Sequence, residues 1–134
     1  MITNADITIY NRKYDKDVRL DIWQRTVIKG AHFYVDNKVS VGDGGLRSAA
    51  VYKIRIPEDA ECERTYLPED EYIKAADTSD YWTIQEDDIV VHGICEIEIE
   101  RPAILKELHK RYCKITSWSD NRFGGLPHWR IGGE

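Results

Sequence analysis

The most constraining feature of this sequence is a run of twelve residues, 89–100, in which two different sets of side chains alternate. One set is apolar apart from a glycine (Ile89, Val91, Gly93, Cys95, Ile97 and Ile99), and the other ends in three glutamates. A period of two is that of a β-strand, whose successive side chains point to opposite faces. We therefore expect one long strand over 89–100, bent at Gly93 as closed or sharply curved sheets require.

Shorter runs of β-branched, aromatic and alternating residues predict further strands. They occur at 7–10, 18–28, 39–41, 52–56, 81–84, 112–118 and 128–131. The apolar phase shifts by one residue at Gly30, which predicts a β-bulge or, alternatively, a tight turn. Polar stretches at 11–17 and 36–38 predict turns, and the glycine-rich stretch 42–47 predicts a flexible loop.

Between the predicted strands the sequence indicates one short helix and one long segment that leaves the sheet. A proline at 102, a one-sided apolar patch and cations near the end predict a helix over about 102–110. Residues 57–80 show neither period cleanly and are expected to leave the sheet with limited structure of their own. With 134 residues the chain has the size of one domain, 1–134. The expected fold is mainly β, a small β-barrel or sandwich with one short α-helix.

Charge is spread unevenly along the chain. The net charge is −5, but 57–80 contains nine acids against two cations and so carries −7, which leaves about +2 elsewhere. A protein that binds duplex DNA normally presents a basic stripe, and the sequence contains none. We therefore expect no tight binding to nucleic acid.

The residue types that carry enzymatic chemistry are present but scattered. The four histidines and three cysteines lack the close pairs of a zinc site, and Gly42 to Gly45 lacks the context of a phosphate loop. The adjacent carboxylates Glu86, Asp87 and Asp88 are typical of a solvated turn. We predict no catalytic residues, no cofactor and no metal, and hence no enzyme.

Aromatic residues keep one binding alternative open. Six rings suit a surface that stacks single-stranded nucleic acid, with cations near both ends of the chain: Trp23, Tyr34, Tyr52, Trp82, Trp118 and Trp129. Packing in the core or at a protein interface is the alternative use of such rings, and the acidic total favours it.

The segment Ser119 to Pro127 is longer than a β-hairpin needs. It combines two residue types that are enriched at interfaces, Arg122 and Phe123, with the conformational freedom of Gly124 and Gly125. We predict that these four residues contact a partner protein. The alternative is that Phe123 and Leu126 pack on the domain's own core.

Three stretches of the sequence together resemble a known group of proteins. They are Met1 to Arg12, Trp23 to Gly30, and Ser119 to Arg130 with its Phe123-Gly124-Gly125-Leu126-Pro127-His128-Trp129 core. The combination is similar to a family of uncharacterised phage and prophage proteins of Gram-positive bacteria, in the Clostridium and related groups, encoded among head and neck genes. The order of Ile7-Thr8-Ile9, Trp23 and Tyr112-Cys113-Lys114-Ile115 also resembles the small β-barrels that join phage heads to tails.

This resemblance implies a non-enzymatic virion protein, most simply a head–tail connector or head-closure component of the neck. A minor capsid or tail-completion protein is the alternative within the virion, and a single-stranded nucleic-acid-binding barrel is the alternative from another class. The implied partners are other virion proteins on the portal or tail-completion side, with a homo-oligomeric ring in the particle and no membrane. The implied location is the bacterial host cytoplasm during assembly and afterwards the virion.

Overall fold

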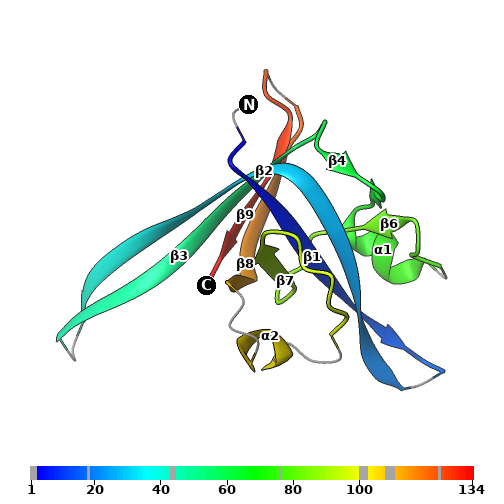
Figure 1. Ribbon diagram of the computed structural model, residues 1–134, viewed down its shortest axis with the longest axis horizontal. Coiled ribbons are helices and arrows are strands. Elements are labelled where there is room, and N and C mark those ends of the chain that lie inside the picture. Colours follow the sequence, from blue (N-terminus) through cyan, green and yellow to red (C-terminus); the bar gives the residue numbers. More distant parts are fainter. Residues whose placement is uncertain are drawn as a thin grey trace.

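The computed structural model describes residues 3–17, 19–42, 45–75, 77–99, 103–107, 111–123 and 125–134, with the backbone alone over 36–42 and 45–50. Six strands form a closed antiparallel barrel (Figure 1). Around the barrel they run β1 (Ala5–Asp15), β7 (Ile89–His92), β8 (Tyr112–Asn121), β9 (His128–Gly133), β3 (Gly45–Pro57) and β2 (Leu20–Gly42). Pairing of β2 with β1 closes the ring. The expected mainly β fold is confirmed, and its form is a barrel.

The strand β2 pairs with two different strands of the barrel because it bends (Figure 1). Its first part pairs with β1, and its second part pairs with β3. Between them the register shifts, so that Ala5 faces Ala31 while Ile7 faces Ile28. Gly30 supplies the extra residue at φ +85°, a conformation that glycine adopts without steric cost, and its N–H donates to Oδ1 of Asp6. The predicted β-bulge at Gly30 is confirmed.

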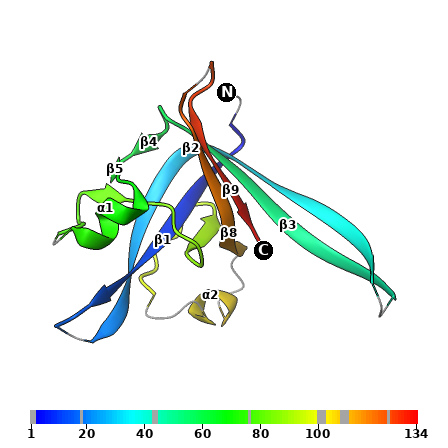
Figure 2. The ribbon, with the colours of Figure 1, turned by 180° about the vertical axis from the view of Figure 1, so that it is seen from behind.

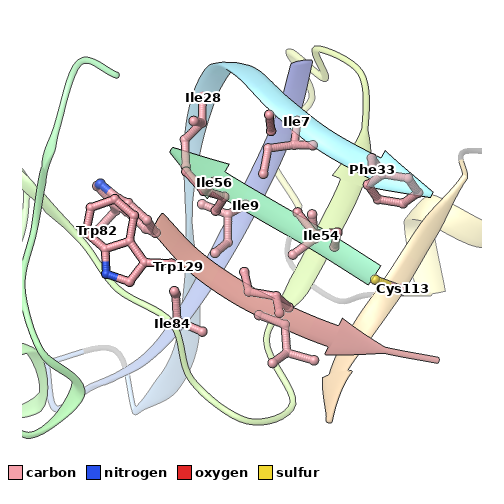
Figure 3. Close-up of a cluster of buried hydrophobic side chains, with 14 residues drawn as sticks. Ile7, Ile9, Ile28, Phe33, Ile54, Ile56, Trp82, Ile84, Cys113 and Trp129 are labelled. Atoms are coloured by element: carbon pink, nitrogen blue, oxygen red, sulfur yellow. The ribbon is translucent and has the colours of Figure 1, made fainter. Parts of the chain in front are cut away.

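The barrel interior is filled by aliphatic side chains from all six strands, with two tryptophans at one end (Figure 3). Its members are Ile7, Ile9, Ile28, Ala31, Phe33, Ile54, Ile56, Trp82, Ile84, Val90, Cys113, Ile115, Trp129 and Ile131. Each side chain of this size contributes about 1.5–3 kcal/mol when it leaves water, so this cluster supplies most of the driving force for folding.

The run 89–100 is not one strand, and this prediction is wrong in its second half. β7 ends at His92, and Gly93 at φ +91° turns the chain onto the outer face of β1. There the N–H of Cys95 donates to the Thr8 hydroxyl, and the Tyr10 hydroxyl donates to the Ile97 carbonyl at 2.6 Å. The alternate apolar residues still become buried, but in a second cluster outside the barrel rather than inside it. That cluster contains Tyr10, Trp23, Ile89, Val91, Cys95, Ile99 and Leu105.

The helix expected near 102–110 is present as α2 (Ala103–Glu107), and its Leu105 is buried in the second cluster. Residues 102 and 108–110 lie outside the described part of the chain. The excursion 57–80 is more ordered than predicted. It contains β4 (Glu61–Cys62), β5 (Thr65–Tyr66) and a second helix, α1 (Glu69–Lys74), and β5 pairs in parallel with β6 (Tyr81–Trp82). Tyr72 anchors α1 because its side chain is fully buried.

One predicted turn is confirmed in part and the other is wrong. Of the stretch 11–17, residues 11–15 continue β1, paired with 20–24 of β2, and only Lys16 and Asp17 form a turn. Residues 36–38 lie within β2, paired with 49–51 of β3. The predicted loop at 42–47 is likewise mostly strand, since Gly42 pairs with Gly45. In these segments the strands form although their composition is polar, because cross-strand hydrogen bonds stabilise them. A two-stranded ribbon that projects from the barrel packs on no core, so its sequence need not alternate between apolar and polar residues. Figures 1 and 2 show both ribbons extending from the barrel in different directions.

Candidate functional site

The loop predicted to contact a partner is shorter than the sequence suggested. β8 continues to Asn121, which pairs with His128 of β9, so Ser119, Asp120 and Asn121 belong to the strand. The connecting residues are 122–127. The end of this loop is fixed to the barrel, because the Pro127 carbonyl accepts a hydrogen bond of 3.0 Å from the N–H of Glu58.

Arg122 anchors the base of the loop to its own domain. Its Nε and Nη2 donate to both oxygens of the Asp120 carboxylate at 2.7–3.0 Å. The guanidinium also lies over the rings of Tyr66 and Trp129, 5.2 Å from each centroid. The ion pair lowers the pKa of Asp120 and raises that of Arg122. A planar fork that is both paired and stacked is held in one orientation, so Arg122 acts as a support rather than as a free contact.

Phe123 and Leu126, in contrast to Arg122, are exposed. Their side chains are 93% and 61% exposed. The alternative reading, in which both pack on the domain's own core, does not describe this structure. Gly125 is exposed and has open space around it, while Gly124 lies outside the described residues. An open depression of about 640 Å³ lies beside Phe123 and Leu126. Of the four predicted contact residues, Phe123 and Gly125 face solvent.

Below the loop, three aromatic rings close this end of the barrel. The ring centroids of Tyr66, Trp82 and Trp129 lie 4.8–5.2 Å apart in tilted and edge-to-face arrangements, and Figure 3 shows the two tryptophans together. Such contacts stabilise the fold beyond simple burial. Because Trp23, Trp82 and Trp129 are buried, their faces are occupied by the protein itself and do not form a platform for nucleic-acid bases.

The carboxylates at 86–88 do not behave alike. Glu86 and Asp87 are exposed, as predicted for a solvated turn, but Asp88 is buried and the prediction is wrong for it. The Asp88 carboxylate accepts hydrogen bonds from Asn11, Gln85 and the backbone N–H of Arg12. Burial raises its pKa to about 6, against the lowering effect of these donors. Every donor is a part of the fold, so the network is structural.

The three cysteines are free thiols, and Cys62 is half-buried. Cys95 and Cys113 are buried, and burial raises the pKa of Cys113 to about 12. Within the described part of the chain, no three His, Cys, Asp or Glu side chains lie close enough together to hold a metal ion. No helix among the described residues is sufficiently long and apolar to cross a membrane.

A groove that the sequence did not reveal lies between the β1–β2 ribbon and the segment that contains α1. Its volume is about 600 Å³. Tyr14, Ile22 and Ile73 border it, with side chains 57%, 46% and 58% exposed. Its two walls come from parts of the sequence fifty residues apart, so periodicity alone carries no signal for it.

Comparison of the whole sequence with known proteins and protein families identifies the family to which the chain belongs. No curated protein and no solved structure matches it. The model of a family of unknown function, DUF6751, matches residues 2–134. The match covers nearly the entire barrel with its ribbons, excursion and loops, and the chain therefore belongs to the DUF6751 family.

Proposed function

We propose that this protein is a non-enzymatic structural component of a phage or prophage virion, namely a head–tail connector or head-closure protein of the neck. Support comes from the resemblance of three sequence stretches to phage-encoded proteins and from the small closed barrel. In this proposal it acts by binding other virion proteins on the portal or tail-completion side. It is assembled in the host cell and remains in the particle.

The observation that carries the proposal is the exposed side chain of Phe123 on a loop with a fixed base. An exposed phenylalanine ring gains about 1.5–3 kcal/mol when a partner covers it. Aromatic residues in such positions dominate the energetics of many protein interfaces. Because Arg122 is held by Asp120 and by two rings, the base of the loop next to Phe123 is fixed, and binding there costs less conformational entropy.

The proposal is tested in a lysogen from which the gene is deleted and then supplied in trans. After induction, purified particles are analysed by electron microscopy and by mass spectrometry. The wild-type gene is expected to restore tailed particles that contain the protein, whereas the deletion is expected to leave heads without tails. The variant Phe123→Ala should fold normally and fail to restore tails.

Ile94→Ala is the matched control, because Ile94 is also an exposed apolar residue, at 48%, but lies on a different part of the surface. It should restore tailed particles. Absence of the protein from purified particles would overturn the proposal. A deletion that leaves tails attached but damages the capsid would assign the minor capsid role instead.

A further inference from the structure

The strand β8 extends well beyond β7, the neighbour that pairs with its first part. β7 pairs with β8 over 112–114, and the hydrogen bonds on this side end at Ile115, whose carbonyl accepts from the N–H of Asp87. Over 117–121, β8 pairs with β9 alone among the described residues. Figures 1 and 2 show this end of the β8–β9 hairpin rising past β7. β7 therefore leaves one edge of β8 free over 117–121, which we call the free edge.

The hydrogen-bond pattern shows which backbone groups the free edge offers. Lys114 and Glu134 exchange both of their backbone hydrogen bonds. Because successive residues of a strand direct their N–H and carbonyl groups to opposite sides, every second residue of β9 counted from Glu134 is directed at β8. The register pairs those residues with Ser117, Ser119 and Asn121. The N–H and carbonyl groups of Trp118 and Asp120 therefore point to the free edge, where no described residue forms a backbone hydrogen bond with them.

The Trp118 side chain gives the free edge an apolar surface. Trp118 lies opposite Ile131 of β9, and directly paired residues project to the same side of a sheet. Ile131 is fully buried in the barrel interior, whereas Trp118 is 37% exposed. The two differ because Ile131 has a paired strand on either side, and Trp118 has one on the β9 side alone among the described residues. A strand added at the free edge would cover the ring.

The sequence of the free edge lacks the features that normally prevent an exposed edge from pairing. Such edges usually carry lysine or proline, or are bent by a bulge. Residues 117–121 read Ser-Trp-Ser-Asp-Asn, and the register shift of β8 precedes them. The charge of Asp120 is neutralised by its ion pair with Arg122. Nothing in the composition of this stretch therefore opposes a neighbouring strand.

The surroundings of the free edge decide what kind of segment fits it. At one end Asp87 is bonded to Ile115, and at the other end the Arg122 guanidinium lies over the ring of Tyr66. Parts of the same chain thus border the free edge at both ends. Its outward N–H and carbonyl groups, spaced two residues apart, match the backbone of an extended strand. A short stretch with such borders takes the narrow backbone of a single extended segment rather than the edge of a second barrel.

The free edge leads directly to the exposed ring of the proposed function. Phe123 lies two residues beyond Asn121, the end of β8. The depression of about 640 Å³ beside Phe123 is also lined by Asp120 and Asn121. At about 3.4 Å per residue, a segment paired with Asp120 needs only three more residues to reach Phe123. One partner segment can therefore contact the free edge and the loop together.

We infer that the free edge of β8 binds an extended segment of the partner virion protein, which joins the sheet as a further strand and covers Trp118. The segment has no proline at the positions that pair, and it places an apolar side chain beside Trp118. This inference rests on the proposed function for the identity of the partner. It goes further by naming the backbone of β8 as the element that the partner recognises.

The free edge is tested first in the isolated protein. Amide hydrogen exchange, followed by NMR, should be about tenfold or more faster at Trp118 and Asp120 than at Ser119, because only Ser119 donates to β9. Protection at Trp118 and Asp120 equal to that at Ser119 would mean that the edge is already covered, and the inference would be overturned.

The contact is then tested by blocking the edge without changing any side chain. Residues 1–112, prepared as a thioester, are ligated to synthetic 113–134 through Cys113, which restores the full sequence. In the blocked product the backbone nitrogen of Trp118 carries a methyl group, which removes the donor and obstructs a neighbouring strand. Each product is added to an extract of the induced deletion lysogen, and tailed particles are counted. The unmethylated product is expected to restore tails, and the blocked product to restore about tenfold fewer.

Methylation at Ser119 is the matched control, because its N–H points to β9. It should lower the free energy of unfolding, whereas methylation at Trp118 should leave it nearly unchanged. Equal losses at the two positions would contradict the register on which the inference stands. Circular dichroism checks folding, and methylation at Asp120 replaces that at Trp118 if the latter product does not fold.

The remaining outcomes separate this inference from the proposed function. A blocked product that restores tails as well as the unmethylated one overturns the inference and leaves the proposed function standing. An unmethylated product that restores no tails refutes the proposed function and, with it, the partner named here. Self-association in sedimentation velocity that is lost on methylation at Trp118 would assign the free edge to a second copy, and it would overturn the choice of a partner segment.

Discussion

Asn11 and Asp88 are 77 residues apart in the sequence and meet inside the protein, where Nδ2 of Asn11 donates a 3.0 Å hydrogen bond to the Asp88 carboxylate. The same amide of Asn11 exchanges hydrogen bonds with the backbone of Thr83, donating to its carbonyl and accepting from its N–H. One side chain of β1 thus holds both ends of the segment 83–88 that leads into β7. Gln85 adds a bond of 2.8 Å to the same carboxylate.

This network predicts that stability depends on pH through Asp88. Burial raises its pKa to about 6, against 3.8 for an ordinary aspartate. The folded protein therefore keeps a proton between about pH 4 and pH 6 that the unfolded chain has released. The resulting stabilisation is complete below pH 4 and is lost as the pH rises through 6, an effect of about 3 kcal/mol. Asp88→Asn removes this dependence, so the unfolding free energy of the wild type minus that of the variant should fall by about that amount from pH 4 to pH 7.

Urea denaturation at several pH values measures this difference. Asp87→Asn is the control, because Asp87 is the exposed neighbour of Asp88. This variant leaves the carboxylate of Asp88 and its donors in place, so it should keep the loss of stability that the wild type shows between pH 4 and pH 7. A value for Asp88→Asn that stays constant relative to the wild type would show that folding does not raise the pKa of Asp88.

Replacing Arg122 by lysine tests the anchor of the loop. Lysine keeps the positive charge but lacks the planar fork that pairs with Asp120 and lies over Tyr66 and Trp129. Since the guanidinium is partly exposed, we expect a loss of about 1 kcal/mol in unfolding free energy. Lys114→Arg should change it little, because the 3.8 Å pair of Lys114 with Asp87 is well exposed. Equal stability of Arg122→Lys and wild type would mean that the charge alone holds the loop.

The sequence predicted those features whose cause is local. A one-residue change of phase located the bulge at Gly30, and an apolar patch after a proline located α2. The run 89–100 misled because an extended segment that packs on the outside of β1 has the same period of two as a strand. What distinguishes the packed segment from a strand of the barrel is the presence of Thr8 and Tyr10 on the outer face of β1, where they hydrogen-bond to it. The helix α1 was missed because it buries one residue, Tyr72, among acids.

The candidate site was predicted in part for the same reason. Asp120 and Arg122 are two residues apart in the sequence, so their ion pair can be predicted from the sequence alone. The rings below Arg122 come from positions 66 and 129, which only the closed barrel brings together. Burial of Asp88 likewise depends on donors near position 11. The groove beside α1 lies between the ribbon of β1 and β2 and the segment 57–80, so it can be located only when the positions of both in the fold are known.

We expect the last two glycines of β9, Gly132 and Gly133, to differ in how much stability is lost when each is replaced by alanine. A Cβ at Gly133 would lie 2.8 Å from the Lys114 carbonyl oxygen and 2.8 Å from Cys113 Sγ, so the backbone of β8 must move. A Cβ at Gly132 would meet only the Ser117 hydroxyl, at 2.6 Å, and that side chain can rotate away. Gly133→Ala is expected to lower the unfolding free energy by about 1–3 kcal/mol and Gly132→Ala by much less, as measured by thermal or urea denaturation. Equal losses would show that β9 shifts as a unit.

The segment 93–99 should open without unfolding of the barrel when Tyr10 loses its hydroxyl. Tyr10→Phe keeps the buried ring but leaves the Ile97 carbonyl without its 2.6 Å donor, which costs about 1–2 kcal/mol. That loss falls on the segment outside the barrel, so local opening becomes more frequent. Cys95, which lies 3.2 Å from the Tyr10 hydroxyl in that segment, should react faster with a thiol reagent, whereas Cys113 inside the barrel should remain protected. Peptide mapping by mass spectrometry distinguishes the two from the half-buried Cys62. If Cys95 and Cys113 accelerate equally, the segment opens only with the barrel, and the second cluster is part of one cooperative core.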